Sequence, residues 1–262
     1  MAHRLLMCPP RSNQSSEARR QWDRFVELLR AAADVKVELI DAALHANDLT
    51  FTSHAALVIR DLAVIASAPE PSDRSARQIV RGTLARLGFA TTFLQETAFA
   101  GSADALYDRM RPIVYVGYGA ASDRFATYQL GEYVSSRIVP LGLADPRFPH
   151  LDTVLAPLRS GHVLAYMPGF APHAQRLLRR IVEPEYLIEI SPADAAELAC
   201  NAVELDDAIF VHAASRGLRE RLLAAGYRVL SSELSEFVRR GGGAKRLTLK
   251  LDDGPAAAGA AA

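Results

Sequence analysis

The chain has 262 residues, half of them hydrophobic, and its 30 basic residues balance its 30 acidic ones, so the formal net charge is zero. This balance gives no electrostatic support for binding nucleic acid or an anionic membrane surface. Two cysteines, Cys8 and Cys200, are too few for a disulfide framework and favour a reducing compartment. No apolar run has the length of a secretory signal core or of a membrane span, so we expect a cytoplasmic protein.

Apolar runs of strand type alternate with helical patterns along the chain, which indicates an α/β fold. The strands are predicted, in chain order, at residues 4–7, 35–39, 56–59, 62–66, 90–94, 113–116, 137–140, 163–166, 186–190, 208–211, 228–230 and 245–251. The clearest helices are predicted at residues 17–33, 75–87, 126–134, 171–180, 193–201 and 215–225. The first helix carries one apolar stripe at three- and four-residue steps, formed by Trp22, Phe25, Val26 and Leu29.

Two passages from a helix into a strand resemble each other, at residues 86–90 and 225–229. In each, a glycine (Gly88 or Gly226) follows the helix, where glycine is favoured, and an aromatic residue comes next. This likeness indicates a repeated β-α-β unit rather than two unrelated domains. We predict a single domain over residues 1–251. Residues 252–262, mostly alanine and glycine, have nothing to bury and are predicted to be a disordered tail.

Short segments spread along the chain carry a family resemblance. In order they are Met-Cys-Pro-Pro at 7–10, Asp-Leu-Thr-Phe-Thr-Ser-His-Ala at 48–55, Gly-Ser-Ala-Asp-Ala-Leu at 101–106, Gly-Tyr-Gly-Ala-Ala-Ser at 117–122, His-Leu-Asp-Thr at 150–153, Ala-Cys-Asn-Ala-Val at 199–203 and Gly-Gly-Gly-Ala-Lys-Arg-Leu-Thr-Leu at 241–249. Together they resemble the guanidine-modifying superfamily of arginine deiminases, dimethylarginine dimethylaminohydrolases and glycine amidinotransferases. The resemblance implies the pentein fold, a five-bladed pseudo-symmetric α/β propeller with its site at the centre.

The chemistry that the resemblance implies is covalent. A cysteine thiolate attacks the guanidinium carbon, and a histidine moves protons to the leaving amine and from the incoming water. Carboxylates grip the N–H edges of the guanidinium, which orients it and matches its charge. Neither a metal ion nor a cofactor takes part, so none is expected here.

Several reaction residues of the family are replaced in this chain. Arg246 stands at the position of the nucleophilic cysteine, and Ala100 stands where a glutamate pairs with the catalytic histidine. His54, next to Ser53, falls at the position of an Asp or Asn, and Ala121 falls at that of an arginine. The family's thiol chemistry is therefore excluded at its usual position.

Other site positions are retained. His150 is the candidate acid/base, with Asp152 to orient it, if the protein is active at all. Asp48 and Asp152 are candidate pocket carboxylates, together with Ser53 and His54, whereas Asp104 is expected to tie a turn. His54, His150 and Asp152 lack the spacing of a metal site, and a nucleophilic Ser53–His150 pair lacks a local signature. Both cysteines are expected to be buried structural residues.

Arg246 leaves two alternatives open. Its guanidinium could reach Asp48 or Asp152 and fill the pocket from within, since a buried cation must be paired. Alternatively, local remodelling could turn the side chain to solvent.

Two functional readings follow. The first is a pseudoenzyme that binds a small guanidino or cationic amino-acid ligand, or a protein partner or second copy of itself, without contact with nucleic acid or membrane. The alternative is a divergent hydrolase that acts on a guanidino, amidino or ureido C–N bond through His150, without a cysteine nucleophile. Fold likeness by itself does not decide between them.

Overall fold

The computed structural model describes residues 2–11, 13–41, 49–67 and 74–254. These residues form five three-stranded sheets in a mixed α/β arrangement. Each sheet has a middle strand: β1 (His3–Met7), β4 (Leu62–Ile65), β7 (Ile113–Tyr118), β10 (Val163–Ala165) and β13 (Ala208–Val211). The predicted α/β class is confirmed.

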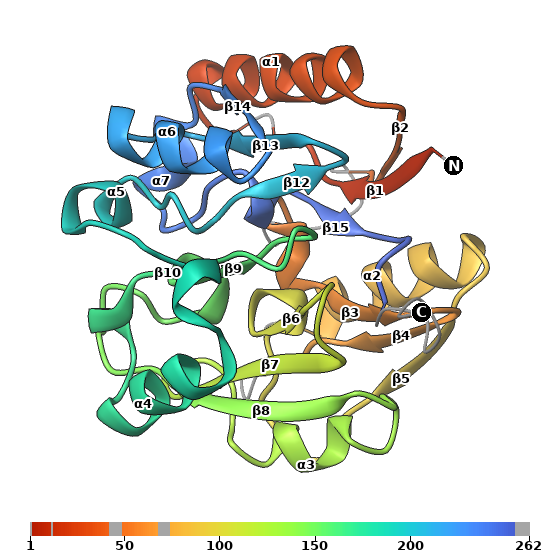
Figure 1. The fold of residues 1–262 in the computed structure, drawn as a ribbon. Coiled ribbons are helices and arrows are strands. Elements are labelled where there is room, and N and C mark those ends of the chain that lie inside the picture. Colours follow the sequence, from red (N-terminus) through yellow and green to blue (C-terminus); the bar gives the residue numbers. More distant parts are fainter. Residues whose placement is uncertain (1, 12, 42–48, 68–73, 255–262) are drawn as a thin grey trace.

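All five sheets are built in the same way. One neighbour of the middle strand is antiparallel to it: β15 (Leu249–Lys250), β3 (Ala56–Ile59), β6 (Ala105–Tyr107), β9 (Leu155–Pro157) and β12 (Val203–Leu205). The other neighbour is parallel to it: β2 (Val35–Leu39), β5 (Ala90–Phe93), β8 (Arg137–Gly142), β11 (Leu187–Glu189) and β14 (Arg228–Ser231). In Figure 1 the first of these two sets lies towards the centre of the molecule, and we call its members the inner strands.

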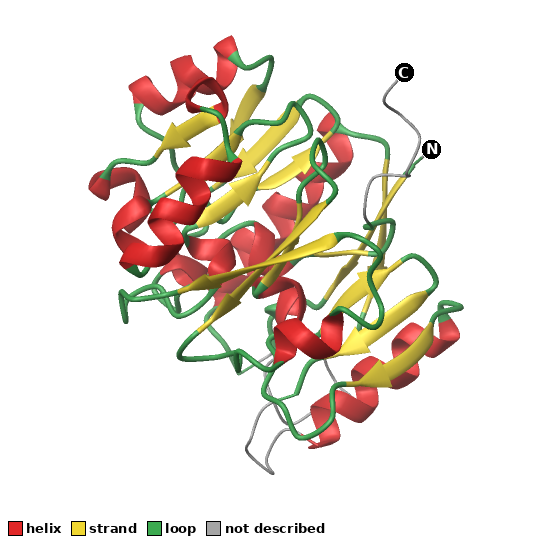
Figure 2. Cartoon of the chain, turned by 60° about the horizontal axis from the view of Figure 1, so that its bottom comes forward, coloured by secondary structure: helices red, strands yellow, loops and turns green. Residues whose placement is uncertain are grey.

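A helix connects each middle strand to its parallel neighbour, as a parallel pair requires. The connecting helices are α1 (Ser16–Ala32), α2 (Arg74–Arg86), α3 (Ala126–Leu130), α4 (Pro172–Ile181) and α6 (Arg216–Ala224). They lie at the periphery, outside the strands (Figures 1 and 2). Two short helices, α5 (Pro192–Ala196) and α7 (Ser235–Val238), lie between sheets in the sequence. The repeated β-α-β unit predicted from two passages is thus present five times.

Local sequence explains the helices. Ser15 caps α1 by accepting the N–H of Ala18 at 3.0 Å, and the predicted apolar stripe of this helix is buried. Gly88 and Gly226 both end their helices with positive φ angles, +96° and +93°, which glycine adopts without strain. Because both positions need a glycine, the two passages look alike in the sequence, and this made the repeat recognisable.

A short 3₁₀ turn precedes four of the inner strands: η2 (Thr52–His54), η4 (Gly101–Ala103), η5 (Leu151–Thr153) and η8 (Lys245–Leu247). A turn containing Asn201 precedes the fifth. We call these five segments the central turns. They pack closely: a Cβ on Gly101 in η4 would lie 2.9 Å from the backbone of Ala56, at the start of β3 just after η2. The packing therefore brings together family-like segments that are far apart in the sequence.

Some predicted elements differ from the structure. The strand predicted at 245–251 begins as η8, and the helix predicted at 193–201 ends at residue 196. The inner strands β6, β9 and β12, of three residues each, were not predicted. Residues 255–262 lie outside the described residues, but Asp252 and Asp253, in the segment predicted as a tail, form ion pairs with His3 and Arg109.

The segments that the structure describes include no helix with the length and apolar character needed to cross a membrane.

Candidate functional site

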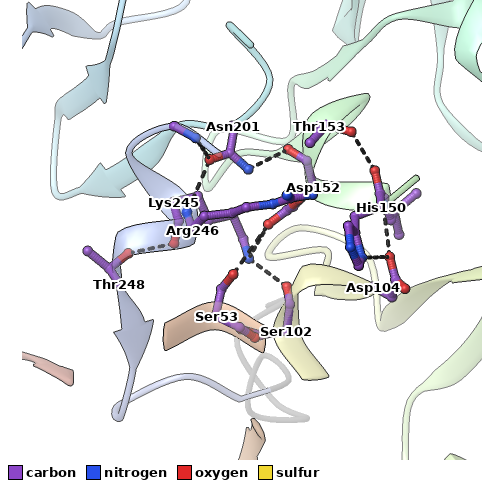
Figure 3. A network of polar contacts seen from close by, with 12 residues as sticks. Ser53, Ser102, Asp104, His150, Asp152, Thr153, Asn201, Lys245, Arg246 and Thr248 are labelled. Atoms are coloured by element: carbon purple, nitrogen blue, oxygen red, sulfur yellow. Dashed lines mark hydrogen bonds and ion pairs between the residues drawn. The ribbon is translucent and has the colours of Figure 1, made fainter. Parts of the chain in front are cut away.

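The central turns place four polar side chains around a single point: Ser53 from η2, Asp152 from η5, Asn201, and Arg246 from η8 (Figure 3). All four are buried, with at most 3% of their surface exposed. Charged and polar groups at this depth need partners, since burying an unpaired charge is strongly unfavourable. The contacts among these groups therefore determine what the site can bind.

Asp152 is the carboxylate at the centre of this cluster. The Nε atom of Arg246 lies 3.4 Å from its Oδ1, and the Nζ atom of Lys245 lies 3.9 Å from its Oδ2. The Ser53 hydroxyl lies 3.5 Å from the same Oδ2. Two cations thus face a single fully buried carboxylate. Burial, the largest cause, lowers the pKa of Lys245, and Asp152 acts in the opposite direction.

Asn201 fixes the backbone that carries Arg246. Its side-chain amide donates to the carbonyl of Asp152 at 3.2 Å, and its oxygen accepts the N–H groups of Gly243 at 2.9 Å and Arg246 at 3.1 Å. One side chain therefore ties two central turns together. Its role was not predicted, although it lies in the Ala-Cys-Asn-Ala-Val segment.

Gly242 gives Arg246 the room to turn inward. A Cβ at residue 242 would lie 2.6 Å from a ring carbon of Phe51 and 2.8 Å from Cδ of Arg246. The same Phe51 ring lies 6.0 Å from the Arg246 guanidinium, at the outer limit of a cation–π contact. The glycine run is therefore a packing requirement of the buried arginine rather than a phosphate loop.

His150 lies beside a second buried carboxylate. Its Nδ1 is 3.4 Å from Oδ1 of Asp104, within ion-pair distance but without hydrogen-bond geometry. Asp104 also accepts the N–H of Leu151 at 2.8 Å and the hydroxyl of Ser122 at 2.6 Å. Asp104 was predicted to tie a turn, which it does. In addition it lies beside His150.

The His54 ring packs on the His150 ring, with 4.3 Å between their centroids. Burial, the largest cause, lowers the pKa of His54 well below its ordinary value, and the neighbouring Arg246, His150 and Lys245 lower it further. His54 is therefore neutral at pH 7. Among the described residues, no three His, Cys, Asp or Glu side chains come together as a metal site.

Neither cysteine can act as a thiolate nucleophile in this state. Both side chains are fully buried, and neither cysteine forms a disulfide. Burial raises the pKa of Cys8 to about 12 and also raises that of Cys200. Since only the thiolate is a strong nucleophile, both thiols are inert at neutral pH.

The structure brings together Ser53, Asp152 and Arg246 and, beside them, His54 and His150. Asp152 contacts the two cations and Ser53, whereas the carboxylate that faces His150 is Asp104. The remaining predicted pocket residue, Asp48, lies outside the described residues.

The chain resembles known proteins over nearly its whole length, although no protein-family model matches it. It is 32% identical, across 95% of its residues, to the bifunctional arginine dihydrolase/ornithine cyclodeaminase ArgZ of a Synechocystis strain. The structure of the N-terminal domain of ArgZ, as a Cys-to-Ser variant bound to substrate, matches with a TM-score of 0.91 and 31% identity. This match covers 96% of our chain and 99% of that domain. The chain belongs to the guanidine-modifying, or pentein, superfamily.

Within this superfamily the chain corresponds to one part of its longer relatives, since it spans 38% of the length of ArgZ. The dimethylarginine dimethylaminohydrolase of Mycobacterium tuberculosis is 28% identical to our chain, over 89% of our chain and 76% of its own length. A dimethylarginine dimethylaminohydrolase structure with a TM-score of 0.73 and 18% identity shares the fold.

Proposed function

We propose that this superfamily member is a pseudoenzyme, without thiol-dependent hydrolase or transferase activity, whose guanidine subsite is filled by Arg246. The buried Arg246–Asp152 pair is the observation that carries this proposal. We also infer that residues 1–251 form one domain with the pseudo-symmetric five-bladed arrangement of a propeller, because five like sheets surround the central turns. The cytoplasmic location remains a prediction.

Charge is the physical reason that a substrate would be excluded. A guanidinium substrate needs a carboxylate with free acceptor positions. Asp152, the carboxylate at the centre of the subsite, already faces the cations of Arg246 and Lys245. A substrate cation would therefore be repelled by two like charges at close range unless Arg246 left the site. To leave, Arg246 would have to give up its ion pair with the buried Asp152 and move into solvent.

The protein would therefore act by binding rather than by turnover. A variant of the relative AgrE has been solved as a binary complex with L-arginine, and the N-terminal domain of ArgZ, which our chain covers to 99%, has been solved bound to substrate. These complexes support an amino-acid type of ligand. For this chain the favoured small ligand lacks a guanidinium group, because that position is occupied. A protein partner or a second copy of the chain remains the other form of binding.

Removing the Arg246 side chain tests the proposal. The wild-type protein and Arg246→Ala would be titrated calorimetrically with arginine, agmatine and guanidinoacetate. Turnover of the same compounds would be followed by mass spectrometry. We expect no turnover by either protein, and binding of guanidino compounds by Arg246→Ala at least tenfold tighter than by wild type. Arg216→Ala is the matched control, because the Arg216 side chain is 93% exposed and pairs with Glu220. Equal binding by wild type and Arg246→Ala would reject self-occupancy.

The pairing of His150 with Asp104 favours a second candidate function. A histidine held beside a buried carboxylate is the arrangement of a general acid/base. The protein would then hydrolyse a guanidino, amidino or ureido C–N bond with water as nucleophile. Product formation by the wild type that is lost in His150→Gln would establish this candidate and overturn the pseudoenzyme proposal. His173→Gln, a histidine that contacts Tyr118 instead, is the control.

A further inference from the structure

Apart from the buried cluster at the central turns, the molecule has a cavity along the inner strands. It is lined by residues of β6, β9, β12 and β15 and of the segments beside them, and its volume is about 70 Å³. A single buried water needs about 10–15 Å³ by this measure, so the cavity has room for a small ligand only. Lys245 stands between the two sites: its Nζ donates to the carbonyl of Ser102, which lines the cavity, and also faces Asp152.

Three cationic side chains line this cavity: Arg109, Lys245 and Lys250. The acidic side chains in its wall are Glu204 and Asp253, and both are engaged. Glu204 accepts the N–H of Arg159 through both oxygens, at 3.0 and 3.1 Å, and the hydroxyl of Tyr227 at 2.6 Å. Asp253 forms an ion pair with Arg109. Neither carboxylate of the wall forms an ion pair with Lys245 or Lys250, and Lys245 faces Asp152 instead.

Lys250 shows this most clearly. An ammonium group has three N–H donors, and the Lys250 Nζ donates to the backbone carbonyl of Glu204 at 2.5 Å. Within the described ranges it forms no ion pair with a carboxylate. Burial, the largest cause, and the nearby Arg109 lower its pKa to about 8. An anion in the cavity would form an ion pair with Lys250 and accept hydrogen bonds from its remaining N–H groups.

Much of the rest of the wall is apolar, with Leu155, Leu158 and Val203 among its residues. A hydrated inorganic ion gains little from such a surface, whereas an organic anion buries its hydrocarbon part there. We propose that this cavity is a binding site for a small carboxylate with an apolar body, held by Lys245 and Lys250. This goes beyond the proposed loss of turnover and does not depend on it.

Three probes test the site by calorimetry on the full chain at pH 7: 4-methylpentanoate, its neutral amide 4-methylpentanamide, and inorganic phosphate. We expect the carboxylate to bind at least tenfold more tightly than either other probe. Equal binding of the amide would reject recognition by the lysines, and equal binding of phosphate would reject the apolar half of the proposal. Absence of carboxylate binding would reject it altogether.

Two variants locate the binding. Lys250→Met keeps the apolar stem of the side chain and removes its charge, so it should weaken carboxylate binding at least tenfold. Lys36→Met is the control, because the Lys36 side chain is 65% exposed on β2. Ala156→Leu narrows the cavity and leaves both lysines in place, so it should also weaken carboxylate binding. This variant keeps the test possible if Lys250→Met does not fold. Unchanged affinity in a folded Lys250→Met or Ala156→Leu protein would overturn the assignment.

Discussion

Asp152→Asn should destabilise the protein far more than Arg246→Met does. The asparagine removes the carboxylate that faces two cations, Arg246 at 3.4 Å and Lys245 at 3.9 Å, and leaves both buried without their counter-charge. The methionine leaves Asp152 with Lys245 and with the Ser53 hydroxyl at 3.5 Å. Removing one partner of a buried pair costs about 3–5 kcal/mol when its partner is left unpaired. We therefore expect about 3–5 kcal/mol for Asp152→Asn and about 1–2 kcal/mol for Arg246→Met.

The pair also sets a coupling energy. At 3.4 Å, and with an effective dielectric constant of about 20, two unit charges attract by about 5 kcal/mol. The second cation on Asp152 and the loss of hydration on burial reduce the net value. A double-mutant cycle over Asp152→Asn and Arg246→Met should therefore give a coupling of about 2 kcal/mol.

Urea unfolding followed by far-UV circular dichroism measures the four stabilities of this cycle. The control is the cycle over Arg216→Met and Glu220→Gln, an ion pair at 2.7 Å whose side chains are 93% and 61% exposed. Its coupling should stay below about 0.5 kcal/mol. Additive effects of Asp152→Asn and Arg246→Met, or a larger loss from the arginine than from the aspartate, would refute the reasoning.

Three further predictions use other parts of the molecule. Gly242→Ala should lower the free energy of unfolding by about 1–3 kcal/mol, because its Cβ would lie 2.6 Å from Phe51. Gly217→Ala, with no atom within 4 Å of the new Cβ, should leave stability the same or slightly raised, and equal urea midpoints for the two variants would contradict the packing argument. Both cysteines are fully buried, so neither should react with Ellman's reagent at pH 8 until the protein is unfolded; rapid labelling of the native protein would contradict this. Carboxylate binding in the cavity beside Lys250 should weaken roughly tenfold from pH 7 to pH 9. The reason is that Lys250 of the free protein loses its proton with a pKa of about 8, whereas the anion binds the protonated lysine. A flat pH profile, or a profile that Lys250→Met leaves unchanged, would refute a binding role for Lys250. The other charged groups that act on that pKa are Arg109, Glu204, Asp252 and Lys245.

Periodicity predicted the outer parts of the fold well and the centre poorly. Most middle strands and connecting helices are long enough to show their periods, and β13 was predicted with its observed bounds. The inner strands β6, β9 and β12 have three residues each, and the short turns in front of them have no period of their own. The centre could therefore be anticipated only through the family-like segments.

The same limit applies to the site. The unusual residue at position 246 was evident in the sequence, because the segment around it retains the family pattern. Whether its side chain points inward depends on long-range packing: on the space above Gly242 and on the hydrogen bonds of Asn201, 45 residues away. The ion-pair distance between His150 and Asp104 likewise depends on two central turns that are distant in the sequence. Such contacts cannot be deduced from local spacing.

The most direct test of the central claim is chemical rescue of Arg246→Ala. If the guanidinium of Arg246 fills the guanidine subsite and pairs with Asp152, ethylguanidinium should occupy the space that the alanine leaves. At a concentration tenfold above its Kd, and well below denaturing levels, it should raise the free energy of unfolding of Arg246→Ala by about 1.4 kcal/mol. The wild type and Arg216→Ala should gain nothing. Equal responses in all three proteins, or none in Arg246→Ala, would contradict a guanidine subsite filled from within.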